Sequence, residues 1–215
     1  RVRVVPGARS SSYLYITDER GDMQLAVNDM AVCNEISPEY LERVLPGIQA
    51  GALVLDTNLP VESLEFICRS SCIPLYADPV SSVKAMKLHG VMKHLRAIKP
   101  NALEAAALTG QTDPELAARA LIDEGVQRVF ISLGTNGMIA AEGSRILRMP
   151  SPEANVVNAT GAGDAAMSAI VWADLHGLSL EDSARAAQLA GAITCASEES
   201  NAPELSRLPG LLAAE

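Results

Sequence analysis

Aromatic residues are scarce in this chain. Phe, Trp and Tyr make up only 3% of its 215 residues, whereas hydrophobic residues as a whole make up 48%. The core must therefore be aliphatic and rich in alanine, which suits helices packed closely on a parallel sheet. No apolar run approaches the roughly 20 residues of a membrane-spanning helix, so we expect no membrane partner. The length suggests one domain with at most a small appendage.

The cysteines show no pairing pattern, and basic residues are in the minority. Cys33, Cys68, Cys72 and Cys195 include no C-x-x-C pair, and no histidine pair stands at zinc spacing. We interpret them as reduced thiols of a cytoplasmic protein. The formal net charge of −9 argues against nucleic acid or an anionic membrane surface as a partner. A polyanionic substrate such as ATP would then need a local positive site or a metal ion.

Residues 158–164 read Asn-Ala-Thr-Gly-Ala-Gly-Asp and open directly into a helical pattern of small residues. A glycine-rich turn at a helix start exposes several backbone N–H groups at the positive end of the helix dipole, and this arrangement binds phosphates. Asp164 falls in the first helical turn, within reach of a hydroxyl brought up to the phosphate. A phosphate cradle beside a carboxylate base is what phosphoryl transfer to an alcohol requires. An ordinary glycine turn with an aspartate near the helix start would give the same letters.

Between residues 52 and 131, short apolar runs alternate with helical patterns, which indicates a parallel sheet with helices on its faces. We expect strands over 52–55, 73–77, 95–98 and 128–131. Helices are expected after Pro60, over 83–94, over 101–108 with Gly110 closing the helix, and after Asp113. Two further strands are expected over 137–148 around a turn at 142–144, and then helices after Asp164, Ser179 and Pro203. Near the N-terminus, alternating runs over 12–17 and 23–27 flank turn residues at 18–22 and predict a hairpin, and Ser37 is expected to cap a helix.

A polar or glycine-rich cluster follows each predicted strand of the parallel sheet, where ligands bind in open α/β sheets. These clusters are residues 56–58, 78–79, 99–104 and 132–137, and the 158–164 segment is the fifth. Asn101 and Glu104 either form a reciprocal helix cap or order Mg²⁺ near a triphosphate, and both can hold at once. Ser132, Gly134 and Gly137 would let the backbone approach a nucleotide, although a plain turn explains these residues equally well.

Three of these clusters resemble, in order, the motifs of the ribokinase-like (PfkB) carbohydrate kinases. Residues 99–104 are similar to that family's N-x-x-E element, Ser132-x-Gly134-x-x-Gly137 to its nucleotide-side loop, and residues 158–164 to its C-terminal signature. Within the family, the chain looks most like the pseudouridine kinases, on the basis of residues 28–30, 76–84 and 99–104 and of the unusual Asn158. The resemblance implies a three-layer α/β fold, with a mainly parallel sheet, helices on both faces and a small β lid. Residues 1–30 would be part of the lid and residues 31–215 the nucleotide-binding core.

The resemblance also implies roles for single residues. Asp164 would deprotonate the 5′-hydroxyl of the substrate, while the N–H groups of Gly161, Ala162 and Gly163 would hold the charge that develops on the γ-phosphoryl group. Asn101 and Glu104 would position Mg²⁺. The remaining candidates are Ser132, Gly134, Gly137, Asn158, Thr160 and Asn201 for ATP, with K⁺ as a further candidate cofactor, and Asn28 beside Asp164 for the substrate.

Two departures from the family pattern bear on these roles. Ala159 stands where the family generally has threonine or a similar residue, and Asn158 removes a negative charge, so the usual cation-site chemistry is in question. The first sheet strands and sugar contacts of the family are missing ahead of Arg1. We therefore expect a fragment whose sugar site is incomplete.

The sequence thus predicts an ATP-dependent kinase that phosphorylates the 5′-hydroxyl of a nucleoside or sugar, with pseudouridine as the leading candidate and a homodimer formed through the lid. The alternatives are a ribokinase-like kinase for another sugar or nucleoside, and a non-catalytic ligand-binding protein or inactive fragment of the same fold. A dinucleotide oxidoreductase is disfavoured because no predicted strand is followed by G-x-G-x-x-G.

Overall fold

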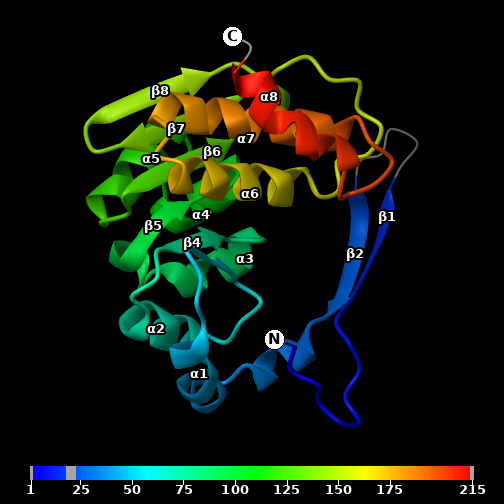
Figure 1. The fold of residues 1–215 in the computed structure, drawn as a ribbon, viewed down its shortest axis with the longest axis vertical. Helices are drawn as coiled ribbons and strands as arrows, with labels where there is room; N and C mark the ends of the chain where they lie inside the picture. The colour runs from blue at the N-terminus through cyan, green and yellow to red at the C-terminus, as the bar shows by residue number, and fades with distance from the viewer. Residues whose placement is uncertain (1, 18–22, 214–215) are drawn as a thin grey trace.

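The structure, a computed structural model, describes residues 2–17 and 23–213. Its centre is a six-stranded sheet in the strand order β3-β4-β5-β6-β7-β8 (Figure 1). The first four strands are parallel neighbours, and the last two continue the sheet in antiparallel fashion. The six are β3 (Leu53–Asp56), β4 (Leu75–Asp78), β5 (Leu95–Ile98), β6 (Arg128–Ser132), β7 (Met138–Glu142) and β8 (Arg145–Met149). The predicted strands and the mainly parallel sheet are confirmed.

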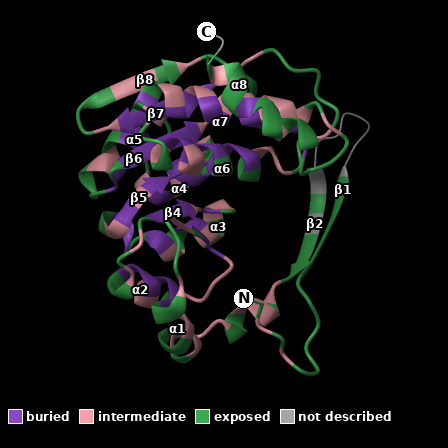
Figure 2. Ribbon diagram, viewed as in Figure 1, coloured by how far each residue is buried: buried purple, intermediate pink, exposed green. Residues whose placement is uncertain are grey.

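Helices cover both faces of this sheet because successive strand side chains point to opposite sides. Leu75 and Ile131 pack in the core on one face, and their chain neighbours Tyr76 and Phe130 pack in the core on the other. The first face is covered by α1 (Pro38–Val44), α2 (Val61–Ser70), α3 (Ser82–Ala85), α4 (Ala102–Thr109) and α5 (Pro114–Asp123). The second is covered by α6 (Ala162–Leu175) and α7 (Leu180–Cys195), with α8 (Leu208–Ala213) packed on them. Buried residues concentrate between these layers, so the three-layer architecture is confirmed (Figure 2).

Local sequence signals set the helix ends. The side chains of Ser37, Asp113 and Ser179 each accept a hydrogen bond from a backbone N–H in the first turn of the helix that follows. Gly110 ends α4 in the left-handed conformation, with φ of 72°, which glycine adopts at little cost. These caps agree with the sequence prediction.

The continuous helix predicted over residues 83–94 is wrong. The segment breaks into α3 and two 3-10 turns, η3 (Met86–Leu88) and η4 (Met92–His94). Gly90 lies in the break, where it weakens a helix by about 1 kcal/mol relative to alanine. Leu88, Val91 and Met92 are all buried, so tertiary packing decides the path of the chain here. The helix expected after Pro203 likewise begins as a 3-10 turn, η6 (Pro203–Arg207), before α8.

A separate two-stranded hairpin precedes the main sheet. It pairs β1 (Ser12–Thr17) with β2 (Met23–Asp29) in antiparallel fashion, as predicted, while the turn expected at 18–22 lies outside the described residues. The hairpin stands opposite the start of α6 (Figure 1), and the 3-10 turn η1 (Ala31–Glu35) then leads into α1. The hydroxyl of Tyr15 lies 3.3 Å from that of Thr160, which joins the hairpin to the loop before α6.

A cluster of buried charges fixes the other end of α6. Asp174 accepts hydrogen bonds from Arg96 at 2.6 and 2.8 Å, from Arg128 at 3.1 Å and from the hydroxyl of Tyr76. Burial alone would raise the pKa of Asp174, but the hydrogen bonds from Arg96 and Tyr76 and the two guanidinium charges hold it below its usual value. Because its partners lie on β4, β5 and β6, this aspartate anchors α6 to the sheet and so determines where the first turn of the helix lies.

Candidate active site

The glycine-rich loop before α6 is held in place by close packing and by one amide side chain. Gly161 has a φ of 87°, and a Cβ atom there would lie 2.2 Å from the carbonyl oxygen of Ser200, so only glycine fits. Asn158 accepts a hydrogen bond from the Thr160 N–H at 2.9 Å and donates one to the Glu198 carbonyl at 3.2 Å. Asn158 therefore ties together the two loops at this end of the molecule.

Asp164 is exposed in the first turn of α6, as the third residue of the helix. Ala162, Gly163 and Ala166 line a large cavity on one side of the same turn. Successive helix residues are rotated by about 100°, so Asp164 stands on a face adjacent to Gly163 rather than inside this cavity. The acid and the cavity thus share one helix start from two directions, an arrangement suited to two substrates that meet there.

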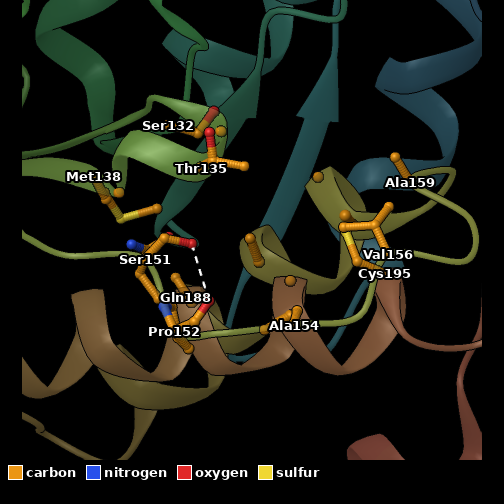
Figure 3. A pocket seen from close by; sticks show the side chains of 18 of the residues that line it. Ser132, Thr135, Met138, Ser151, Pro152, Ala154, Val156, Ala159, Gln188 and Cys195 are labelled. Carbon is orange, nitrogen blue, oxygen red and sulfur yellow. Dashed lines mark hydrogen bonds between the residues drawn. The ribbon is translucent and has the colours of Figure 1, made fainter. Parts of the chain in front are cut away.

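The cavity has a volume of about 1120 Å³, at the upper end of the ~300–1,000 Å³ range of small-molecule sites. Figure 3 shows Ser132 and Thr135 on one side and Gln188 and Cys195, on α7, on the opposite side. The α7 residues that line the cavity are spaced as one helix face: Ala187, Gln188, Gly191, Ala192 and Cys195. The room is therefore sufficient for a nucleotide lying between the β6–β7 loop and α7.

The predicted nucleotide-side residues Ser132, Gly134 and Gly137 all line this cavity, but the two glycines differ. Gly134 has a φ of 59° and open space where a side chain would be, so a ligand can approach its backbone. At Gly137 a Cβ atom would lie 1.9 Å from the Met149 carbonyl oxygen. Glycine at 137 is thus already required by the packing of β8, whatever else it contacts.

Lys99 is the functional candidate to which the sequence interpretation gave no role. It follows β5, is 5% exposed, and its Nζ lies 3.0 Å from Oδ2 of Asp78. A Cβ atom on Gly163 would lie 3.5 Å from this ammonium group. Of the described residues that line the cavity, Lys99 alone carries a positive side chain. Its ammonium group therefore faces the same helix start as the predicted phosphate cradle, where an anion would be stabilised.

Asn101 and Glu104 form the reciprocal helix cap. The Asn101 side chain accepts from the Glu104 N–H, and the Glu104 carboxylate accepts from the Asn101 N–H, each at 2.9 Å. Burial, reinforced by the nearby charge of Asp78, raises the pKa of Glu104 above its usual value. No group of three or more His, Cys, Asp or Glu in residues 2–17 and 23–213 could hold a metal ion. Mg²⁺ commonly uses one or two carboxylates with phosphates and water, so this pair fits a metal ion that arrives with a nucleotide.

The remaining candidates, Thr160, Asn28 and Asn201, do not line the cavity. Thr160 sits in the loop before α6 and contacts the hairpin through Tyr15. Asn28 is exposed on β2, in register with Tyr13. Asn201 is exposed in the loop after α7 and does not line the cavity, although its neighbour Ser200 packs on Gly161.

Of the helices that the structure describes, none is long and apolar enough to cross a membrane.

Comparison with known proteins gives a consistent result. Residues 1–207 match the pfkB family of carbohydrate kinases. Pseudouridine kinase of Escherichia coli is 35% identical over 94% of this chain and 67% of its own length. An uncharacterized sugar kinase of the same organism is 33% identical over 93% of this chain and 58% of its own length. Ribokinase from Thermotoga maritima superposes with a TM-score of 0.83 at 20% identity, covering 95% of this chain and 70% of that structure. The ribokinase-like fold is thereby confirmed, and the chain spans between 58% and 70% of the length of these relatives.

Proposed function

Because the chain belongs to the pfkB family of carbohydrate kinases, we propose that the protein containing it transfers the γ-phosphoryl group of ATP to an alcohol of a small nucleoside or sugar. Kinases of this family are phosphotransferases with an alcohol acceptor. The observation that carries the proposal is the start of α6, where the exposed carboxylate of Asp164, a glycine-rich anion cradle and the buried ammonium of Lys99 meet at one end of a large cavity.

Each of these groups has a distinct part in the proposed reaction. The cavity holds ATP with its phosphates toward Gly161, Ala162 and Gly163, whose N–H groups lie at the positive end of α6. Lys99 adds a fixed positive charge for the transferring group. Asp164 takes the proton from the acceptor hydroxyl. Ser132, Gly134 and Gly137 contact the nucleotide from the opposite wall of the cavity.

Asn101 and Glu104 are the residues that would hold Mg²⁺, which when bound supplies neutralisation of phosphate charge. A monovalent cation such as K⁺ would bind at the loops around Asn158, Thr160 and Asn201. The Asn158 side chain already joins these loops by donating to Glu198 and accepting from Thr160. An uncharged amide in that position also attracts a cation less than a carboxylate would.

Pseudouridine is the acceptor that we propose first, with phosphorylation at its 5′-hydroxyl. The support is the 35% identity to a pseudouridine kinase over nearly the whole chain. The second candidate is another sugar or nucleoside, because an uncharacterized sugar kinase is 33% identical over a similar span. A net charge of −9 is also consistent with a small-molecule rather than a nucleic-acid substrate.

A substrate panel tests this proposal on the full-length protein. Pseudouridine, uridine, ribose and fructose are each incubated with ATP and Mg²⁺, and ADP release and product mass are measured. We expect Mg²⁺-dependent phosphorylation with the highest kcat/KM for pseudouridine. Transfer to another acceptor of the panel alone would retain the kinase but reject pseudouridine. Ligand binding without turnover of any acceptor would identify a binding protein instead.

We further propose that the β1–β2 hairpin is part of a lid over the acceptor and that two copies pair through it. Leu14, Ile16, Leu25 and Val27 are between 57% and 72% exposed, and the strand register places all four on one face, which we call the outer face of the hairpin. An exposed aliphatic face of this kind favours contact with another protein surface. The full-length protein is expected to sediment as a dimer and a Leu14→Glu, Val27→Glu variant as a monomer. A parent protein that is monomeric at micromolar concentration would contradict the pairing.

A further inference from the structure

The turn that follows β4 has a strained backbone. Val80 has a φ of 64°, and of the non-glycine residues in the described part of the chain it alone has a positive φ. Valine adopts this region at a cost in free energy because its branched side chain crowds the backbone. The Ser81 N–H donates to the Pro79 carbonyl oxygen at 2.7 Å, which closes a tight γ-turn around Val80. Such a conformation persists only where the surrounding contacts impose it.

A threonine with no part in the proposed reaction fixes this turn. Thr57 directly follows β3 and is fully buried, with 0% exposure. Its hydroxyl donates to the Pro79 carbonyl oxygen, the same atom that accepts from Ser81. The turn after β4 is therefore tied to the end of the neighbouring strand.

The turn directs the carboxylate of Asp78, the last residue of β4. Oδ1 of Asp78 accepts from the Val80 N–H at 3.1 Å, and Oδ2 lies 3.0 Å from Nζ of Lys99. Among the described residues, no other carboxylate forms an ion pair with Lys99. Because the backbone holds one oxygen of Asp78, the other oxygen has a fixed direction toward the ammonium group.

The ammonium group of Lys99 needs such a partner to stay in one place. The Lys99 N–H donates to the Ala77 carbonyl oxygen at 3.1 Å, which fixes the backbone only. Lysine carries its charge at the end of a flexible stem, and this stem reaches into a large cavity. Nζ faces Gly163, where a Cβ atom would lie 3.5 Å from it. A charge stabilises a transition state most when it is held in position beforehand.

We propose that Asp78 and Thr57 are positioning residues. Asp78 holds the Lys99 ammonium against the start of α6, and Thr57 fixes the turn that directs Asp78. The inference rests on the proposed function, in which Lys99 stabilises the transferring phosphoryl group, and it deepens that function.

Charge alone predicts the opposite effect for Asp78. A carboxylate 3.0 Å from the ammonium group opposes its field at a bound phosphate. If Asp78 contributed only its charge, removing that charge would speed phosphoryl transfer. If Asp78 holds Lys99 in place, removing it slows the reaction.

Two conservative substitutions in the full-length protein separate these cases. Asp78→Asn keeps the size of the side chain and an oxygen for the Val80 N–H, but its amide nitrogen cannot accept from Lys99. Thr57→Val removes only the hydrogen bond to Pro79. We expect kcat to fall about 10- to 100-fold in Asp78→Asn and about three- to tenfold in Thr57→Val, with KM for ATP changed less than about twofold.

Thr109→Val is the matched control. The Thr109 hydroxyl also donates to a backbone carbonyl oxygen, that of Ala105 at 2.8 Å, and it lies at the end of α4 outside the cavity lining. Its kcat should equal that of the parent. All rates are compared at a temperature at which circular dichroism shows every variant to be folded.

The same two substitutions are then made in the Lys99→Met protein. Neither Asp78→Asn nor Thr57→Val should lower kcat further there, because both residues act through Lys99. A general loosening of the structure would lower kcat in both backgrounds.

A second measurement does not depend on turnover. In full-length protein labelled with ¹⁵N-lysine, the NMR signal of the Lys99 Nζ is assigned by its absence in Lys99→Met. We expect restricted motion of this ammonium group in the parent and larger motion in Asp78→Asn and Thr57→Val.

Three results would overturn the positioning role: an equal fall in kcat in the parent and Lys99→Met backgrounds, an unchanged or faster kcat in Asp78→Asn, or an Nζ group as mobile in the parent as in the variants. Failure of the proposed function looks different. A parent protein that phosphorylates no acceptor would reject the kinase. Restriction of Nζ that is lost in both variants would still show that Asp78 and Thr57 hold Lys99.

Discussion

An Asp164→Asn variant is expected to lose about 10²- to 10⁴-fold in kcat, the usual contribution of a positioned general base, while KM for ATP changes little. Asp164 is exposed in the first turn of α6, and ATP is proposed to occupy the cavity lined by the neighbouring Ala162 and Gly163. Asparagine keeps the size of the side chain but cannot accept the proton of the acceptor hydroxyl. The change therefore removes the proton transfer and leaves the nucleotide contacts in place.

Loss of the favourable charge at a helix start costs at most about 1 kcal/mol, so the Asp164→Asn protein should melt within a few degrees of the parent. Glu181→Gln is the matched control, because Glu181 is also an exposed acid in the first turn of a helix, at the end of α7 remote from the cavity. Its kcat should stay within twofold of the parent value. Retention of more than a tenth of the activity in Asp164→Asn would remove that residue from the reaction.

The parts of the fold that were predictable are those set by local sequence. Helix caps at Ser37, Asp113 and Ser179 and the left-handed glycine at 110 depend on a few neighbouring residues, and all four occur as expected. The buried strands were visible as short apolar runs. The helix prediction for residues 83–94 was wrong because Gly90 weakens the helix and because the broken turns bury Leu88, Val91 and Met92. That burial depends on the assembled core and is not visible in the local sequence.

The site shows the same division between local and distant information. The cap formed by Asn101 and Glu104 follows from their spacing of three residues. The pairing of Lys99 with Asp78 joins the ends of two neighbouring strands and cannot be read from either segment alone. The packing of Ser200 on Gly161 joins loops 39 residues apart, so the sequence shows the glycine but not the contact that requires it. Motif order alone indicated the proposed reaction centre, whereas the place of the Lys99 charge beside Gly163 became visible only in the folded chain.

A Lys99→Met variant is expected to lower kcat/KM for phosphoryl transfer by about 10²- to 10³-fold, the scale of removing one preorganised group that stabilises transition-state charge. The Lys99 ammonium is nearly fully buried beside Gly163, where water screens its field weakly. Lys93→Met is the matched control, since Lys93 is exposed on the turn before β5, and its kcat/KM should not change.

Stability must be separated from catalysis in this variant, because Lys99→Met also leaves the Asp78 carboxylate without its partner, and breaking a buried pair costs about 3–5 kcal/mol. Lys99→Met combined with Asp78→Asn removes both charges and should regain most of the melting temperature. Its activity should remain as low as that of Lys99→Met alone, since the positive charge beside the phosphate cradle is still missing. Recovery of activity together with stability would show that Lys99 only neutralises Asp78. A double variant that is stable but inactive would show that the positive charge of Lys99 acts in the reaction itself.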